Sequence, residues 1–283
     1  MSEPSFLGLP SSPLSDARVV VLPVPLEATV SYGHGTAGGP SAILAASHQV
    51  ETFDQETLVE FEDGSPIHSA EPFHRADAEP LSTYLDRLSS HACELRKHGA
   101  LVLGLGGEHL LTYGLARGAV DDLSQLTVVQ IDAHADLRDR LHGDHWSHGT
   151  VMRRLWEQGA NLLQIGIRSL CSSEHALIQR EDRIRCFYAH QLSDCGSLLA
   201  EIAAISGPIY LSIDVDGLDL GLVSSTGTPD PGGLTWRQAL RIIDAAAPRL
   251  VGADIVEYIP AAFTPLDAVP ARLAARLLAA YCG

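Results

Sequence analysis

Two apolar runs that end in clustered acids and a histidine constrain this chain more than any other feature. Residues 128–131 and 209–213 have the pattern of strands buried on both faces of a sheet. The polar residues that follow these runs are Asp132, His134, Asp136, Asp214 and Asp216. Carboxylates gathered at a strand end repel one another unless a cation compensates them. The pattern therefore predicts a metal site at one edge of a sheet.

Alternating strand and helix patterns predict an α/β fold. The expected strands cover residues 18–25, 100–105, 126–131, 161–167, 185–188, 208–213 and 250–256. The expected helices cover residues 41–49, 80–98, 109–119, 148–158, 172–180, 194–205, 235–247 and 268–281. This alternation predicts a single three-layer domain, with a largely parallel central sheet and helices on both faces.

Three segments lie outside this alternation. Residues 1–17 are rich in proline and serine, and we expect an N-terminal arm, loose or capping the surface, before one domain at 18–283. Residues 31–40 are glycine-rich and predict a loop. Residues 51–80 carry acids, prolines and histidines without a clear period, which predicts an excursion with one or two short strands.

Charge and hydropathy exclude several classes of protein. The formal charge of −16, without a basic patch, argues against a nucleic-acid partner and favours small cations. No stretch has the 18 or more apolar residues of a membrane helix. The first five residues lack the basic and apolar regions of a signal peptide, so we expect a cytoplasmic protein.

Two further strands add polar groups to the expected site, because ligands of open α/β sheets bind beyond the carboxyl ends of strands. Residues 100–105 precede Glu108 and His109, and residues 250–256 precede Glu257. The candidate metal ligands are then His109, Asp132, His134, Asp136, Asp214 and Asp216. Four carboxylates and two imidazoles exceed the needs of one ion, but bridging carboxylates would let them hold two. This oxygen-rich set suits Mn²⁺, with Co²⁺, Ni²⁺ or Zn²⁺ as competitors. We expect Glu108 to orient the ligands by hydrogen bonds or to cap a chain end rather than to bind metal itself.

These motifs together resemble the ureohydrolase family, which includes arginases and agmatinases. The matching segments are GGEH at 106–109, DAHAD at 132–136, SIDVDGLD at 212–219, Glu257, and the opening VLPVP at 21–25 with its following glycine-rich loop. The resemblance covers nearly the whole chain. It implies an arginase-like fold, two Mn²⁺ ions per subunit and a homo-oligomer, either a trimer or a hexamer.

The resemblance also implies a ligand set and a reaction. One metal would be bound by His109, Asp132, Asp136 and Asp214, and the other by Asp132, His134, Asp214 and Asp216. A metal-bridging hydroxide would attack a guanidino group and release urea and a primary amine. Glu257 would hold the guanidinium, Asp136 would help to move the proton of the hydroxide, and His148 would contact the substrate and protonate the leaving amine.

The segment after DAHAD bears on the substrate. Arginases place an asparagine two residues past this motif, where this chain has Arg138. DLRD at 136–139, followed by SHGTVMRR at 147–154, resembles the agmatinase branch. We therefore expect hydrolysis of agmatine to putrescine, a step of polyamine metabolism, with Asp139 and Asp144 near the far amine. Arg138 leaves open a guanidino acid such as guanidinobutyrate, or an arginase-like substrate.

One departure from the family pattern keeps other classes open. Residues 220–225 lack two prolines that the family often has, which affects the expected substrate more than the expected metals. A metal-binding relative without turnover would share all six ligands, and a urea-release assay separates it from an enzyme. A single-zinc deacetylase on a related fold is the other alternative, and metal titration separates it.

Overall fold

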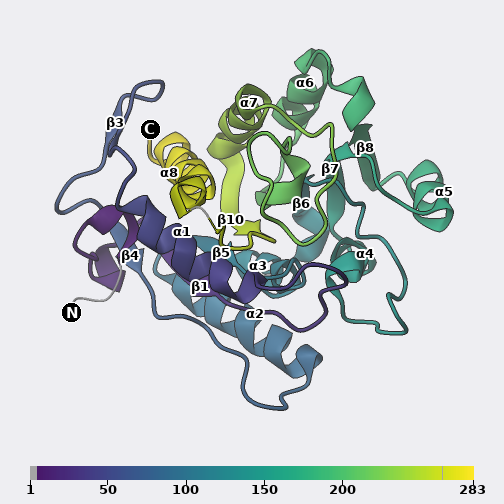
Figure 1. Ribbon diagram of the computed structural model, residues 1–283, viewed down its shortest axis with the longest axis horizontal. Coiled ribbons are helices and arrows are strands. Elements are labelled where there is room, and N and C mark those ends of the chain that lie inside the picture. The colour runs from purple at the N-terminus through teal and green to yellow at the C-terminus, as the bar shows by residue number, and fades with distance from the viewer. Residues whose placement is uncertain (1–4, 263) are drawn as a thin grey trace.

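The computed structural model describes residues 5–262 and 264–283, which form one α/β unit around an eight-stranded sheet (Figure 1). The strands of this sheet are β1 (Val19–Val24), β4 (Ile67–Ser69), β5 (Leu101–Gly106), β6 (Thr127–Ile131), β7 (Asn161–Ile167), β8 (Ile184–Tyr188), β9 (Ile209–Asp214) and β10 (Leu250–Val256). Their order is β4-β1-β5-β10-β9-β6-β7-β8, and neighbouring strands pair in parallel. The predicted parallel sheet is confirmed.

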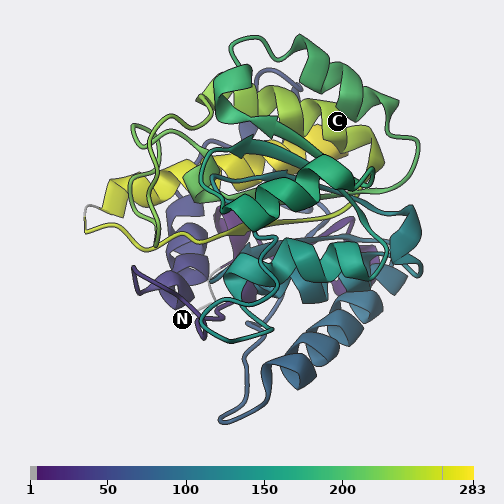
Figure 2. The same cartoon turned by 90° about the vertical axis from the view of Figure 1, so that its right-hand side faces the viewer.

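Helices cover both faces of the sheet. They are α1 (Gly39–Ser47), α2 (Leu81–Lys97), α3 (Leu111–Ala119), α4 (Val151–Glu157), α5 (Ser172–Arg180), α6 (Gly196–Ala204), α7 (Trp236–Ala246) and α8 (Ala268–Cys282). Buried side chains of α1, α6, α7 and α8 belong to one hydrophobic core, and those of α2, α3, α4 and α5 belong to another. Figure 2 shows α2, in blue, and α8, in yellow, on opposite sides of the sheet. The predicted three layers are confirmed.

The apolar strands explain why two cores form. In β1, Val19 and Val21 belong to the first core, whereas Val20 and Leu22 belong to the second. Successive side chains of a strand point to opposite faces of the sheet. A strand that is apolar at every position must therefore be covered on both faces, as parallel sheets usually are.

The N-terminal segment packs against the body of the protein. Phe6 and Leu7 are buried in the first core. The Phe6 N–H donates to Ser69 Oγ at 2.9 Å, and the Leu7 N–H donates to Ser47 Oγ at 2.8 Å. These contacts join the segment to β4 and α1, so residues 5–9 lie on the protein rather than loose beside it.

Residues 51–80 hold three short strands, one more than the sequence predicts. β2 (Phe53–Asp54) and β3 (Val59–Glu60) pair as an antiparallel hairpin, which projects from the body in Figure 1. The third is β4, which extends the edge of the main sheet. Strands of two or three residues are too short to show a period in the sequence.

Among the described residues, no helix is long and apolar enough to cross a membrane.

At two of the expected helix starts, beside the site residues His109 and His148, the α-helix begins later than predicted. The helix expected from residue 109 begins at Leu111, because Gly107 and Glu108 donate backbone hydrogen bonds to Val24 O and Leu26 O. The helix expected from residue 148 begins as a 3-10 turn, η5 (His148–Thr150), and continues as α4.

Candidate active site

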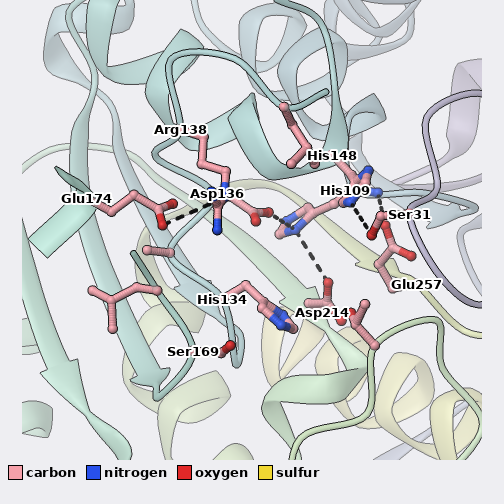
Figure 3. A pocket seen from close by; sticks show the side chains of 14 residues that line it. Ser31, His109, His134, Asp136, Arg138, His148, Ser169, Glu174, Asp214 and Glu257 are labelled. Carbon is pink, nitrogen blue, oxygen red and sulfur yellow. Dashed lines mark hydrogen bonds and ion pairs between the residues drawn. The ribbon is translucent and has the colours of Figure 1, made fainter. Parts of the chain in front are cut away.

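The predicted ligands meet at the carboxyl ends of four neighbouring strands, β5, β10, β9 and β6. β5 precedes His109, β10 precedes Glu257, β9 ends in Asp214, and β6 precedes Asp132. A cavity of about 280 Å³ opens there. Its lining includes Ser31, His109, His134, Asp136, Arg138, His148, Ser169, Glu174, Asp214 and Glu257 (Figure 3). Strands far apart in the sequence thus build one pocket, at the edge where α/β sheets bind ligands.

His109 directs a buried nitrogen at three carboxylates. Its Nδ1 lies 2.9 Å from Asp136 Oδ2, 3.2 Å from Asp132 Oδ2 and 3.5 Å from Asp214 Oδ2. Despite these short distances, Nδ1 has no hydrogen-bond partner among the described residues. A buried polar atom without a partner is costly, and a cation between the nitrogen and the carboxylates would remove that cost.

A buried network fixes the orientation of the His109 ring. Its Nε2 lies 2.9 Å from Ser212 Oγ, and the Ser212 hydroxyl donates to Asp254 Oδ1 at 2.7 Å. Asp254 also accepts from Tyr210 at 2.7 Å and from Thr112 at 2.8 Å. Because the Ser212 proton goes to Asp254, the serine oxygen accepts from the Nε2–H of His109. Nδ1 then keeps its lone pair for a metal.

The sequence analysis missed this network, although a signal for it exists. Ser212 and Asp254 are polar residues within strands that are otherwise almost wholly apolar. Both are fully buried. A polar residue in such a run needs a buried hydrogen-bond partner, but the sequence does not reveal which one.

The ligands form two overlapping groups. Among the described residues, His109, Asp132 and Asp214 form one, and Asp132, His134 and Asp216 form the other; the ligand atoms of each group lie within 4.8 Å of one another. In the second group, His134 Nδ1 lies 3.0 Å from Asp216 Oδ2 and 3.6 Å from Asp132 Oδ1. Asp132 belongs to both groups. Carboxylate oxygens with a minority of imidazole nitrogens fit divalent cations.

Crowded charges shift the pKa values in this cluster. Burial and the charge of Asp132 raise the pKa of Asp136 to about 7. Burial, followed by the charge of Asp216, raises the pKa of Asp214 well above its usual range. Burial disfavours a charged His134, but Asp132 and Asp216 still raise its pKa to about 11. The cluster thus holds protons where no cation balances it, and metal binding would displace them.

Glu257 and Asp136 adopt the left-handed backbone conformation, which is uncommon for residues other than glycine. Their φ angles are 64° and 53°, and such strain costs about 1–3 kcal/mol per residue. Glu257 Oε1 accepts from the His109 N–H at 2.7 Å, and the Glu257 N–H donates to Gly107 O at 2.8 Å. Burial raises the pKa of Glu257 to about 8. Strain of this kind is typical of functional sites.

His148 lines the pocket on the side of the glycine-rich loop. Its Nδ1 lies 3.2 Å from Thr29 Oγ1, and its Nε2 lies 3.4 Å from Ser31 Oγ, the contact drawn in Figure 3. Burial is the main cause that lowers the pKa of His148 to about 4. The ring is therefore neutral at pH 7 in the metal-free protein.

The structure does not bring Asp139 or Asp144 to the pocket, as far as the described lining residues go. The Asp139 carboxylate instead accepts from the buried guanidinium of Arg154 at 3.3 Å. Arg154 reaches this loop from α4, one turn beyond η5. The Asp139 side chain is largely exposed, and its partner is Arg154 rather than a residue of the pocket lining.

Glu174 supplies an acid to the pocket wall that the sequence analysis missed. Its Oε1 accepts from the Leu137 N–H at 2.9 Å, and its Oε2 accepts from the Cys171 N–H at 2.8 Å. Oε2 also lies 4.0 Å from Arg138 Nε. In the sequence Glu174 has only the position of an ordinary acid in the first turn of a helix, and nothing local places it near a ligand.

The sequence profile of the arginase family matches residues 17–283. This match and the geometry of the site define the class of the protein: the chain belongs to the arginase family and is a metal-binding ureohydrolase.

Individual relatives lie in the agmatinase-like part of this family. The chain is 37% identical over 255 residues to the N(1)-aminopropylagmatine ureohydrolase of Synechocystis sp., covering 87% of this chain and 83% of the relative. It is 30% identical over 258 residues to the agmatinase of Pyrococcus horikoshii, and the match covers 89% of this chain and 87% of the relative. Among solved structures, the proclavaminate amidino hydrolase of Streptomyces clavuligerus has a TM-score of 0.88 at 27% identity. The match covers 99% of this chain and 97% of that structure's chain.

Proposed function

We propose that this protein hydrolyses a linear, cationic guanidino compound to urea and a primary amine. The observation that carries the proposal is the pair of overlapping ligand groups beside the buried carboxyl of Glu257 in one pocket. A guanidinium is a poor electrophile, so its hydrolysis needs an activated water. Two bound divalent cations would lower the pKa of water at the site and polarise it for attack.

The six ligand residues would hold two such cations, and Mn²⁺ suits their oxygen-rich set best. Co²⁺, Ni²⁺ and Zn²⁺ are the competitors. Asp132 is shared by both ligand groups and would help to hold both ions. Bound cations would also lower the pKa of the surrounding carboxyls and keep them ionised.

Three residues would act on the substrate. An ionised Glu257 would hold the guanidinium nitrogens by charge-assisted hydrogen bonds and so position the carbon for attack. Asp136 would accept a proton from the attacking water. His148 would give a proton to the leaving nitrogen as its bond to the guanidinium carbon breaks.

Agmatine is the first candidate substrate, with putrescine as its amine product. The agmatinase relative supports it, and the net charge of −16 favours the approach of a dication. N(1)-aminopropylagmatine is the second candidate, because the relative with 37% identity acts on it by name. Asp139 has no part in this proposal, since its carboxylate pairs with Arg154.

The test is urea release by Mn²⁺-loaded protein across a panel of guanidino compounds. The panel is agmatine, N(1)-aminopropylagmatine, arginine, guanidinobutyrate, guanidinopropionate and free guanidine. We expect turnover of one of the two cationic amines and little of the three acids. Preference for one of the acids would indicate that the substrate is a guanidino acid whose carboxylate is bound by Arg138. No urea from any compound, with two metals bound per chain, would overturn the proposal.

A further inference from the structure

A hydrogen-bond relay joins Glu108, Thr29 and His148 behind the pocket. Glu108 is fully buried, and its Oε2 accepts from the N–H groups of Ala28 at 2.7 Å and Thr29 at 2.6 Å. Its Oε1 accepts from the Thr29 hydroxyl at 3.1 Å. On the other side, Thr29 Oγ1 lies 3.1 Å from the backbone nitrogen of His148 and 3.2 Å from His148 Nδ1.

The hydrogen atoms in this relay can be counted. A threonine hydroxyl has one proton and two acceptor lone pairs. Both backbone N–H groups donate to Oε2 of Glu108, and the Thr29 hydroxyl donates its single proton to Oε1. The Thr29 oxygen then accepts from the backbone N–H of His148 and from Nδ1–H of its ring. Ser147 Oγ, at 3.4 Å from Nδ1, is a second and longer partner.

This count fixes the state of the other ring nitrogen. A neutral imidazole carries its proton on one nitrogen only, so a protonated Nδ1 leaves Nε2 with a free lone pair. Nε2 faces the pocket beside Ser31 (Figure 3). The bare nitrogen is therefore on the substrate side of the ring.

We propose that Thr29 is a positioning residue that selects the Nδ1–H tautomer of His148, and that Glu108 orients the Thr29 hydroxyl for this task. The inference rests on the proposed function, in which His148 transfers a proton. Nε2 takes a proton that derives from the attacking water and gives it to the leaving nitrogen as the carbon–nitrogen bond breaks. The ring returns to its neutral state, and the proton leaves with the amine. The opposite tautomer would present an N–H that cannot accept that proton.

The first experiment compares Thr29→Val with Thr29→Ser, using the substrate that the wild-type protein turns over. We expect Thr29→Val to lower kcat by about 10- to 100-fold, the usual effect of losing a supporting hydrogen bond at such a site, with KM nearly unchanged. The pH profile should also shift, because the protonated ring loses an acceptor at Nδ1 and its pKa falls. Thr29→Ser keeps the hydroxyl and should restore both kcat and the profile.

Thr36→Val is the matched control. Thr36 is a buried threonine close to Thr29 along the chain, and its hydroxyl donates to Glu27 Oε2 at 3.4 Å. This variant loses a hydroxyl of the same kind at a position that the relay does not use. It should leave the pH profile unchanged. An unshifted profile in Thr29→Val, or failure of Thr29→Ser to restore it, would overturn the proposal.

A double-mutant cycle tests the role of Glu108. The amide of Glu108→Gln can donate to the Thr29 oxygen, which turns the hydroxyl proton toward His148 and favours the wrong tautomer. We expect a loss of kcat similar to that in Thr29→Val, with the metal content retained. The double variant should be no slower than Thr29→Val alone, because Glu108 acts through Thr29. Additive losses, or a loss that follows missing metal, would contradict the relay.

A spectroscopic readout separates this inference from the proposed function. The ¹⁵N shifts of the His148 ring can be measured in protein loaded with diamagnetic Zn²⁺ and assigned with a His148→Gln variant. We expect a protonated Nδ1 and a bare Nε2, with this pattern altered in Thr29→Val. The opposite tautomer in the wild-type protein would overturn the relay even in an active enzyme. An inactive wild-type protein with the expected tautomer would overturn the proposed function instead.

Discussion

At the scale of single residues, Asp214 has the position on which the first ligand group depends. It is the last residue of β9, its Oδ2 lies 3.5 Å from His109 Nδ1, and its Oδ1 accepts from the Asp216 N–H at 3.0 Å. The same side chain thus touches one ligand and holds the turn that carries another. Its removal would affect both groups.

We expect Asp214→Ala to abolish urea release and to lower the metal content per chain. Both are measured on the same sample, by a urea assay and by elemental analysis. Asp194→Ala is the control, because the Asp194 carboxylate is exposed and accepts from the Gly196 N–H at the start of α6, away from the ligand groups. Full activity in Asp214→Ala would show that the ligand assignment is wrong.

Glu257 tests substrate binding separately from metal binding. Glu257→Gln keeps the size of the side chain and removes its charge. We expect kcat/KM to fall about 10- to 100-fold, as for the loss of a hydrogen bond to a charged group. The metal content should stay the same, because Glu257 is not one of the six proposed metal ligands. Unchanged steady-state kinetics would contradict the role of Glu257 in holding the guanidinium.

At the scale of elements, the turn between β5 and α3 positions His109. Gly107 and Glu108 bind the backbone of Val24 and Leu26, and the carbonyl of Gly107 accepts from Glu257. Three chain segments meet at this turn at very short range. A Cβ atom on Gly107 would lie 2.0 Å from Leu26 O, so a glycine is required here.

We expect Gly107→Ala to destabilise the protein by about 1–3 kcal/mol, the usual cost of overpacking, and to weaken metal binding by displacing His109. Thermal unfolding and metal titration measure the two effects. Gly196→Ala is the matched control at the start of α6, because its Cβ would meet its nearest atom at 3.5 Å, an ordinary contact. Equal melting temperatures for the two variants would argue against a close-packed turn.

At the scale of the whole molecule, the ligand cluster links stability to metal and to pH. Four aspartates and Glu257 lie together at the centre of the sheet edge, and burial raises the pKa of Asp136 to about 7 and of Glu257 to about 8. A carboxyl with a raised pKa binds its proton more tightly in the folded protein. Its contribution to stability is present below its unfolded pKa and is lost as the pH rises through the folded value.

Removal of metal should therefore lower the melting temperature, and more strongly at higher pH. For the metal-free protein we expect a decline between about pH 4 and pH 8, from the usual pKa values of these carboxyls up to their raised values in the folded protein. Metal-loaded protein should lack this decline, because the cations compensate the charges. Thermal unfolding with and without a chelator across this range is the measurement. Equal melting temperatures after verified chelation would contradict the metal site.

The assembly of the protein stays a prediction from the family resemblance, which implies trimers or hexamers. Light scattering of the metal-loaded protein should give about three or six times the chain mass of 30.2 kDa. A mass near that of a single chain at micromolar concentration would contradict the expectation.

Local patterns predicted most of the fold. The strands at 161–167 and 250–256 and the helix at 172–180 have the predicted bounds, and the other long elements differ at one or both ends. Periodicity and residue chemistry are local properties, so the sequence is sufficient for them. Before α3 a long-range contact intervenes, because the Glu108 N–H donates to Leu26 O.

The sequence by itself determined which residues could be metal ligands, because carboxylates clustered after buried strands repel one another unless a cation compensates them. It did not determine the order β5-β10-β9-β6, which makes those strand ends neighbours. The tertiary structure also decided that Glu174 rather than Asp139 lines the pocket, and that Thr29 meets His148 across 119 residues. Such pairings depend on the packing of whole elements, and hydrogen bonds between distant segments leave no local pattern in the chain.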